Sequence, residues 1–390
     1  MILVIGGGLA GLRAALTIQE SGQQVHLIES NQNLGGRIAT EVVDGFTIDR
    51  GFQVINPGYS EFLRLDIRTN FHAISAGAVA TLNGRRIFFG DPRREIRAVA
   101  QALPQILQTP KPFFGLIRGV LVGRVLERES ADQFLQRMGI TGEIYEYVVE
   151  PFLRGVFLAA LPEVDGRFAQ RVLRSLYREV PGLPDGGVQA LIQELGNRVK
   201  STQCGERVLS ISRSGRGFTV KTSNATFSAR KVIVATDYQN AQEFSHTLPR
   251  VTFARSTAWY FTLESNISHQ HRLHIAPLGL GPVVTSIDLA AVVPSYSPDG
   301  RGLLSVTTLE GSSEAEVRAH LHAIHGDRIE GELIARMDIE NALPIIPPGA
   351  RRSGFLEEDG LIFAGDYLTE PSQNGALLSG RLAGESAINN

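Results

Sequence analysis

A strand, a glycine-rich turn and a helix follow one another at the start of the chain, and this order limits the fold more than any other feature. Ile2–Ile5 is a continuous apolar run, which is typical of a strand buried on both faces of a parallel sheet. Gly6–Gly11 comes next and reads G-x-G-x-x-G, and Leu12–Glu20 has apolar residues at helical spacing. The order predicts the first strand-helix unit of an α/β domain.

The glycines of this turn have separate physical roles. Gly6 permits a tight turn, Gly8 allows the backbone to approach a pyrophosphate, and Gly11 lets the helix pack close to the strand. Leu9 and Ala10 begin the helix, where free amides and the helix dipole favour phosphate groups. We therefore expect a Rossmann-type domain in which these five residues contact a dinucleotide.

An acidic residue ends the second expected strand. Glu29 follows Val25–Ile28 and lies 18 residues past Gly11. A carboxylate at this place accepts hydrogen bonds from ribose hydroxyls and repels a 2'-phosphate. We expect Glu29 and its neighbour Ser30 to contact the ribose of FAD or NAD, and NADP is a poor candidate.

A second glycine pair with an arginine narrows the choice between FAD and NAD. Gly35, Gly36 and Arg37 follow the ribose carboxylate, and a guanidinium can bind phosphate oxygens bidentately. Together with Gly6–Gly11 and Glu29, this pattern resembles the flavin amine oxidase and phytoene desaturase superfamily, which includes protoporphyrinogen oxidase-like enzymes. The resemblance implies FAD and an α/β fold, a Rossmann-type FAD-binding domain of the GR2 type with an inserted α+β substrate domain.

The resemblance also implies contacts from later segments. The family places a D-x-G element, here Asp49 to Gly51, before backbone that approaches the flavin, so Gln53 and Val54 are candidates for that wall. The alternative is that Asp49 only caps a turn. The backbone at Val208 resembles the part of the family's second FAD segment that meets adenine.

The C-terminal region resembles the last FAD segment of the family. Gly365 follows a short apolar strand, and Asp366 is the expected partner of a ribityl hydroxyl. Gly375 and Ala376 open the final helix, whose amides would face the side of the flavin that becomes negative on reduction. We expect these four residues to contact FAD.

The resemblance covers nearly the whole chain and divides it into five segments. The expected division is residues 1–84, 183–240 and 346–390 for the FAD-binding domain, 85–182 for a helical substrate or lid region, and 241–345 for a β-rich substrate domain.

Composition removes several classes of function. The net charge of −2 over 390 residues gives no reason to expect nucleic acid binding. Cys204 is the only cysteine, so we expect no disulfide, no cysteine-rich metal site and non-covalent FAD. No apolar run is long enough to span a membrane, and a strand that begins at residue 2 leaves no room for a signal peptide. We expect a cytoplasmic protein.

A basic stretch allows contact with a membrane surface. Residues 85–128 hold nine Arg or Lys against three acidic residues, with apolar residues largely at helical spacing. One interpretation is a helical lid over the substrate cavity, with solvated arginines. The other is a lid that also contacts a membrane peripherally through residues 93–126, as monotopic members of the family do in the comparable region.

Two histidine groups, at 269–274 and 320–325, both read H-x-H-x-x-H. Neither has a neighbouring cysteine or the H-E-x-x-H spacing of zinc enzymes. We expect solvated surface histidines and no metal.

Departures from the amine oxidase pattern indicate the substrate class. None of the four lysines lies between 241 and 345, where amine oxidases of the superfamily hold one near the flavin, and Ser372 replaces an aromatic residue of the amine cage. We expect hydride removal from a small apolar substrate such as an isoprenoid or carotenoid, with electrons passed to oxygen or a quinone. The alternatives are an amine or protoporphyrinogen-type oxidase, a non-redox FAD-dependent isomerase, a flavin-binding assembly protein, and a plain NAD-binding protein. No residue stands out as a catalytic acid or base.

Overall fold

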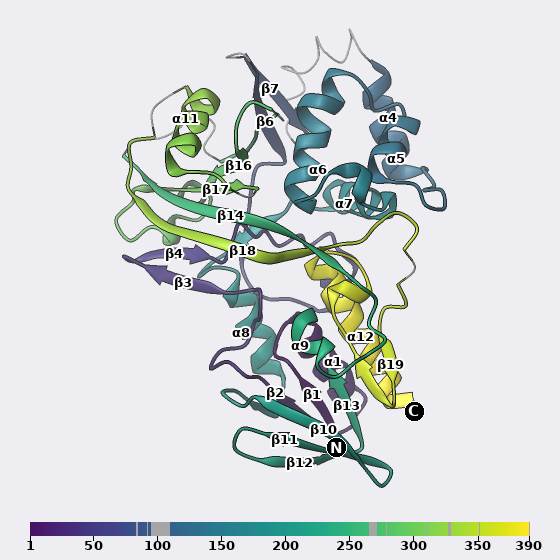
Figure 1. Ribbon diagram of the computed structural model, residues 1–390. Coiled ribbons are helices and arrows are strands. Elements are labelled where there is room, and N and C mark those ends of the chain that lie inside the picture. The colour runs from purple at the N-terminus through teal and green to yellow at the C-terminus, as the bar shows by residue number, and fades with distance from the viewer. Residues whose placement is uncertain are drawn as a thin grey trace.

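Two large sheets, one above the other in Figure 1, organise the protein. The computed structural model describes residues 1–82, 85–91, 93–94, 110–264, 271–277, 279–309, 311–326, 329–350 and 352–389. The lower sheet draws its strands from both ends and the middle of the chain. The upper sheet draws its strands from the two regions between them.

The lower sheet has six strands in the order β19-β20-β13-β1-β2-β9. All neighbours are parallel except β19 and β20. In chain order the strands are β1 (Ile2–Ile5), β2 (Val25–Ile28), β9 (Thr202–Gln203), β13 (Lys231–Val234), β19 (Leu356–Glu358) and β20 (Leu361–Phe363). The central position of β1 brings segments more than 200 residues apart to one edge of the sheet.

Both faces of β1 are covered, as its apolar run predicts. Ile2 and Val4 pack against α1 (Leu9–Glu20), α8 (Gln189–Arg198) and α12 (Gln373–Asn389). Leu3 and Ile5 pack on the other side against a three-stranded antiparallel sheet. Its strands are β10 (Val208–Ser214), β11 (Gly217–Thr222) and β12 (Thr226–Ala229). Successive side chains of β1 enter two different apolar clusters, one on each face of the sheet. This accounts for the absence of polar residues from the strand.

The upper sheet has seven strands in the order β18-β14-β17-β16-β15-β6-β7. In chain order these are β6 (Gly77–Leu82), β7 (Arg85–Gly90), β14 (Thr252–Leu263), β15 (Leu273–Ile275), β16 (Val283–Asp288), β17 (Gly302–Thr308) and β18 (Leu333–Ile345). The expected boundary at residue 84 falls between β6 and β7, which pair with each other in this sheet. Helix α11 (Glu314–His325) packs against one face through Trp259 and Phe261 of β14. The S-x-x-E spacing of Ser313 and Glu316 is a capping box that predicts the start of this helix, and both of its hydrogen bonds are present.

A helical layer stands beside the upper sheet (Figure 1). Its helices are α4 (Pro110–Leu121), α5 (Ala131–Arg137), a π-helix (Tyr145–Val149), α6 (Glu150–Phe157) and α7 (Gly166–Arg178). The sequence from Ser130 to Tyr147 indicates one helix with Ser130 as its N-cap. The single helix is wrong, because Gly139 and Gly142 adopt φ of +88° and +68° and end α5 early. The N-cap is confirmed, since Ser130 caps α5.

Short elements complete the fold. They are β3 (Thr40–Val43), β4 (Phe46–Asp49), α2 (Ser60–Arg64), β5 (Phe71–Ala73), β8 (Gly182–Pro184), α9 (Tyr238–Gln242), α10 (Leu289–Val292) and 3₁₀ turns at Leu161–Glu163, Pro294–Tyr296 and Asp366–Leu368. The Asp44-Gly45 dipeptide between two short runs typical of strands predicts a β-hairpin, and these residues join β3 to β4 with φ of 49° and 84°. No helix in the described part of the chain has the length and apolar character needed to cross a bilayer.

The expectation of solvated histidines is wrong for three of them. His274, His320 and His325 are 1%, 5% and 1% exposed. The rings of His274 and His325 lie 4.3 Å apart between β15 and the end of α11, and Ser286 lies within hydrogen-bond distance of His325. Alternation along β15 and the apolar face of α11 turn these side chains inward. Among the described residues no cluster of His, Cys, Asp and Glu could hold a metal.

This buried histidine pair should make stability depend on pH. Burial, and then the neighbouring His274 and Arg86, lower the pKa of His325 to about 3. The unfolded chain therefore binds a proton near pH 6.5 that the folded chain refuses, so stability is full above this pH and declines as the pH falls toward 3. We expect wild type to lose about 1–2 kcal/mol more than His325→Gln between roughly pH 7 and 5 in urea titrations. The control is His246→Gln, because His246 is exposed and its replacement should leave the dependence of the unfolding free energy on pH as in wild type. The same pH dependence in all three proteins would show that His325 is not its cause.

Candidate active site

One large cavity connects the two sheets. Its volume is about 1160 Å³, and its lining runs from the glycine turn after β1 to the helices α4, α6 and α7. It therefore joins the carboxyl edge of the parallel sheet to the side of the upper sheet. Most of the residues predicted to bind FAD lie along its lower part.

The glycine turn forms the floor of this lower part. Gly6, Gly8, Leu9 and Ala10 line the cavity. Gly6 has a φ of +106°, and a Cβ there would lie 2.5 Å from the carbonyl oxygen of Ala235. At Gly8 a Cβ would meet only one atom within 4 Å, so the space above it is open to the cavity. That open cradle at the start of α1 suits a pyrophosphate.

Glu29 lies beside the turn and is held in place by several donors. Its carboxylate accepts hydrogen bonds from the Gly7 amide at 2.7 Å, the Asn31 amide at 2.8 Å and the Ser30 hydroxyl at 3.1 Å. Only 6% of Glu29 is exposed, and both Glu29 and Ser30 line the cavity. The carboxylate faces the position expected for a ribose.

Arg37 and Asp366 connect the two ends of the chain. An Arg37 Nη2 atom lies 2.5 Å from Asp366 Oδ1, although the residues are 329 positions apart. Gly35 and Gly36 lead into Arg37 and line the cavity with it, and the Gly35 amide donates to the Gly7 carbonyl at 2.9 Å. Arg37 therefore lies next to both the glycine turn, which is expected to face phosphate, and Asp366, which is expected to face the ribityl chain.

The remaining predicted contacts fall into two groups. Those that line the cavity are Gln53, Val54, Val208, Gly365 and Ala376. Gln53 donates to the carbonyl of Arg37 at 3.0 Å. Gly11 and Gly375 are absent from the lining and lie in tight backbone packing instead. A Cβ at Gly11 would come within 1.8 Å of the Gly6 oxygen, and one at Gly375 within 2.1 Å of the Glu370 oxygen.

Asp49 has a structural role rather than a place on the wall. It is 2% exposed and accepts hydrogen bonds from Thr40 Oγ1 at 2.6 Å and from the Val188 amide at 3.0 Å. Burial raises its pKa to about 6. The side chain thus ties the β3–β4 hairpin to the start of α8, and the backbone after it lines the cavity from residue 50 onward.

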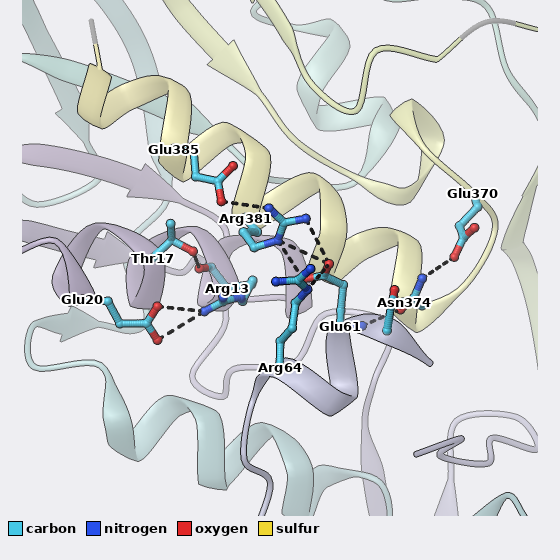
Figure 2. Close-up of polar contacts among 10 residues, drawn as sticks. Arg13, Thr17, Glu20, Glu61, Arg64, Glu370, Asn374, Arg381 and Glu385 are labelled. Atoms are coloured by element: carbon cyan, nitrogen blue, oxygen red, sulfur yellow. Dashed lines mark hydrogen bonds and ion pairs between the residues drawn. The ribbon is translucent and has the colours of Figure 1, made fainter. Parts of the chain in front are cut away.

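Two ionic clusters around α12 were not predicted from the sequence. Figure 2 shows Arg381 of α12 bound by Glu61 of α2 and by Glu385, and Asn374 bound to Glu370. Glu61 is 1% exposed, and its amide donates to Asn374 Oδ1 at 3.0 Å. No local pattern marks the contacts to Glu61, because they join positions 313 to 320 apart. They fix the start of the helix expected to face the flavin.

The upper part of the cavity is largely apolar. Its wall comes from α4, α6, α7 and the edge of the upper sheet, and includes Leu116, Phe152, Val156, Phe168, Val172 and Leu176. Polar residues reappear at Tyr59, Arg171 and Glu370 beside the start of α12. Burial, and then the charge of Glu370, raise the pKa of the Tyr59 phenol. A second polar group, Asp91, Arg93 and Arg94, lines the cavity beside Tyr177 of α7. The cavity therefore has a polar lower half and a largely apolar upper half with two polar groups on its wall.

These observations fit an extended flavin nucleotide. The open cradle at Gly8, the buried Glu29 and the Arg37–Asp366 pair follow one another along one continuous cavity. When bound, a flavin would supply a two-electron acceptor at the boundary with the apolar half.

Comparisons with known proteins agree in fold. A family described as flavin containing amine oxidoreductase matches residues 9–388. A carotenoid 3,4-desaturase from Haloarcula japonica is 26% identical over 282 residues, which are 62% of this chain and 56% of that protein. An oxidoreductase from Methanosarcina mazei has a TM-score of 0.74 at 15% identity, with all of both chains covered. Cyclohexylamine oxidase from Brevibacterium oxydans has a TM-score of 0.70 at 16% identity, with 100% of this chain and 98% of that one covered.

Gly8 and Gly11 should respond differently to the same substitution. Gly8 has a φ of −77°, which alanine adopts readily, and an added methyl group would meet no close protein atom. In Gly8→Ala that methyl group would instead occupy part of the cradle. We expect it to change the stability of the apoprotein by less than about 1 kcal/mol and to weaken FAD binding at least about tenfold. Gly11→Ala meets backbone and should cost about 3 kcal/mol or more. Urea denaturation and flavin fluorescence titration measure the two effects, and undiminished FAD affinity in Gly8→Ala would refute the cradle.

Proposed function

The chain belongs to the flavin containing amine oxidoreductase family, and from this premise we propose that it removes hydride from an apolar, polyene-type substrate while bound to FAD. The match over residues 9–388 confirms the expected superfamily and the expectation of a flavin-dependent enzyme. The chain spans 56% of the length of the Haloarcula japonica desaturase. The specific reaction therefore rests on the cavity of this chain.

One observation carries the proposal: the cavity that begins at Gly6 and Glu29 continues into an apolar chamber. Among the described residues that line it there is no lysine. Ser372, which stands where the resemblance predicts an aromatic residue of the amine cage, also lines the cavity. An amine would lack the lysine and the second cage aromatic of the amine oxidases, whereas a hydrocarbon chain would bury its surface against α4, α6 and α7. These features favour a desaturase-like reaction over amine oxidation.

The residues of the chain supply binding, orientation and exclusion of water. The Arg37–Asp366 pair and Glu29 hold the polar part of FAD, and the apolar helices keep water from the reacting carbon. FAD supplies the hydride acceptor, and oxygen or a quinone would take the electrons afterward. Cys204 lies beside Glu29, which is expected to contact the ribose and not the flavin ring, and this supports non-covalent binding of the flavin.

The proposal also includes peripheral contact with a membrane. Ile117 and Leu121 of α4 line the cavity yet are 55% and 52% exposed, and Val122 and Leu126 beside them are 73% and 53% exposed. An apolar mouth of this kind would let a lipid-soluble substrate pass between membrane and cavity. Residues 95–109 of the expected contact segment, 93–126, lie outside the described residues.

Spectroscopy tests the reaction. The purified protein should be yellow, and a polyene added without air should bleach the flavin absorbance in the course of one turnover. Admission of oxygen or a quinone should restore it. Bleaching by amines and by no polyene would replace the proposal with amine oxidation, and isomerised product without net electron transfer would indicate an isomerase.

Vesicle binding tests the membrane contact. We expect Ile117→Asp with Leu121→Asp to lower co-sedimentation with phospholipid vesicles at least about tenfold, since each apolar side chain contributes about 1.5–3 kcal/mol when buried. Leu209→Asp is the control, because Leu209 is 61% exposed on β10, away from the cavity mouth. Equal losses in both proteins, or no binding by wild type, would refute a specific contact.

A further inference from the structure

An ion pair interrupts the apolar wall where the upper cavity approaches α12. Arg171 on α7 binds the carboxylate of Glu370, which lies three residues before α12 begins. Both residues line the cavity. The side chain of Glu370 is 4% exposed and that of Arg171 is 46% exposed, so the guanidinium is the accessible member of the pair.

Glu370 has little capacity left for another donor. Its Oε1 atom accepts from Asn374 Nδ2 at 2.5 Å and from the Ser372 hydroxyl at 3.2 Å, and its Oε2 atom accepts from Arg171. A carboxylate offers about four lone-pair sites, and three are occupied here. The guanidinium has five N–H donors, and within the described residues it gives one hydrogen bond. Arg171 therefore presents donors to the cavity, and Glu370 holds it in place.

The charge of the pair selects the kind of group that fits. Glu370 balances Arg171, so an added carboxylate would leave a net negative charge in a poorly solvated cavity. An ammonium group would lie beside a guanidinium and find the carboxylate already bonded. A neutral hydroxyl or carbonyl oxygen accepts a hydrogen bond from Arg171 at no cost in charge.

The location of Arg171 matches the inner end of a substrate path along α7. Phe168 and Val172 flank it on the lining face, and Leu176 and Tyr177 continue that face outward. Tyr177 lies six residues further along the helix, a rise of roughly 9 Å. Its ring is stacked under Arg93 on the same lining. A chain lying along α7 would thus place its inner end beside Arg171 and the start of α12.

We propose that Arg171, held by Glu370, is a specificity-determining residue that donates a hydrogen bond to a hydroxyl or carbonyl oxygen on an otherwise apolar substrate. This inference rests on the proposed function and narrows its substrate class to oxygenated polyenes. The competing role for the pair is purely structural, a tie between α7 and the turn before α12. A structural tie would affect the binding of all ligands alike, whereas a hydrogen-bond donor affects oxygenated ligands alone.

A matched series of ligands separates these roles. All-trans-retinol, retinal, retinylamine and axerophthene share one polyene and differ in the terminal group, which in axerophthene is a methyl. Each is titrated into the FAD-loaded protein with the flavin kept reduced, so that no ligand is oxidised, and the dissociation constant is read from the polyene absorbance. The variants are Arg171→Met, the double variant Arg171→Met with Glu370→Gln, which leaves no unpaired charge, and the control Arg64→Met. Arg64 also pairs with a buried glutamate, Glu61, but lies outside the cavity lining.

We expect wild type and Arg64→Met to bind retinol and retinal at least about tenfold more tightly than axerophthene, the effect of one hydrogen bond from a charged donor. Retinylamine should bind no better than axerophthene. The double variant should lose the preference while its affinity for axerophthene stays within about threefold. An equal affinity for all four ligands in wild type, or a preference that survives in the double variant, would overturn the role of Arg171 and leave the proposed function intact. If a yellow protein binds none of the four, the polyene class and this inference both fall.

Discussion

The ion pair between Arg37 and Asp366 is the contact on which the lower half of the molecule depends. Asp366 is 3% exposed, and a buried carboxylate without a partner would be costly. Its partner arrives from the loop after β2, at the other end of the chain. The topology of the parallel sheet makes this meeting possible, because β1 pairs with β2 on one side and with β13 on the other. Loops that leave β1 and its neighbours in opposite directions open a crevice at their carboxyl ends, where nucleotides bind in sheets of this kind.

The position of α12 follows from a second set of constraints. A Cβ at Gly380 would lie 2.0 Å from the carbonyl oxygen of Ala10, so α12 can approach α1 only where it has no side chain. From another side, Arg381 meets the buried Glu61 of α2 (Figure 2). From a third, Arg171 meets Glu370 just before the helix. Buried ion pairs add little net stability, but breaking one leaves an unpaired charge, so they fix geometry strongly. Three contacts thus set the angle at which α12 meets the cavity.

The sequence revealed the parts of this arrangement that local patterns encode. The apolar run of β1, the glycine turn, Glu29, the N-cap at Ser130 and the capping box at Ser313 are all short-range signals, and the structure contains each. The early end of α5 was not predicted, because the helical spacing of the apolar residues was given more weight than Gly139 and Gly142. The buried histidines were missed because H-x-H-x-x-H says nothing about which face a neighbouring element covers. The Arg171–Glu370 pair could not be predicted from the sequence, since its members lie 199 positions apart and neither is in a motif.

The upper cavity must be understood from the residues of this chain. Solved structures that are 15–16% identical share the fold with TM-scores of 0.70–0.74, and they include an enzyme named for amine oxidation. The same backbone therefore accommodates different walls, and fold alone does not choose a substrate. Under the proposed function, α7 provides much of that choice. Five of its residues, Phe168, Arg171, Val172, Leu176 and Tyr177, line the cavity from the start of α12 toward its outer part. A small number of substitutions among them could change the accepted substrate while the contacts expected to hold the nucleotide stay in place.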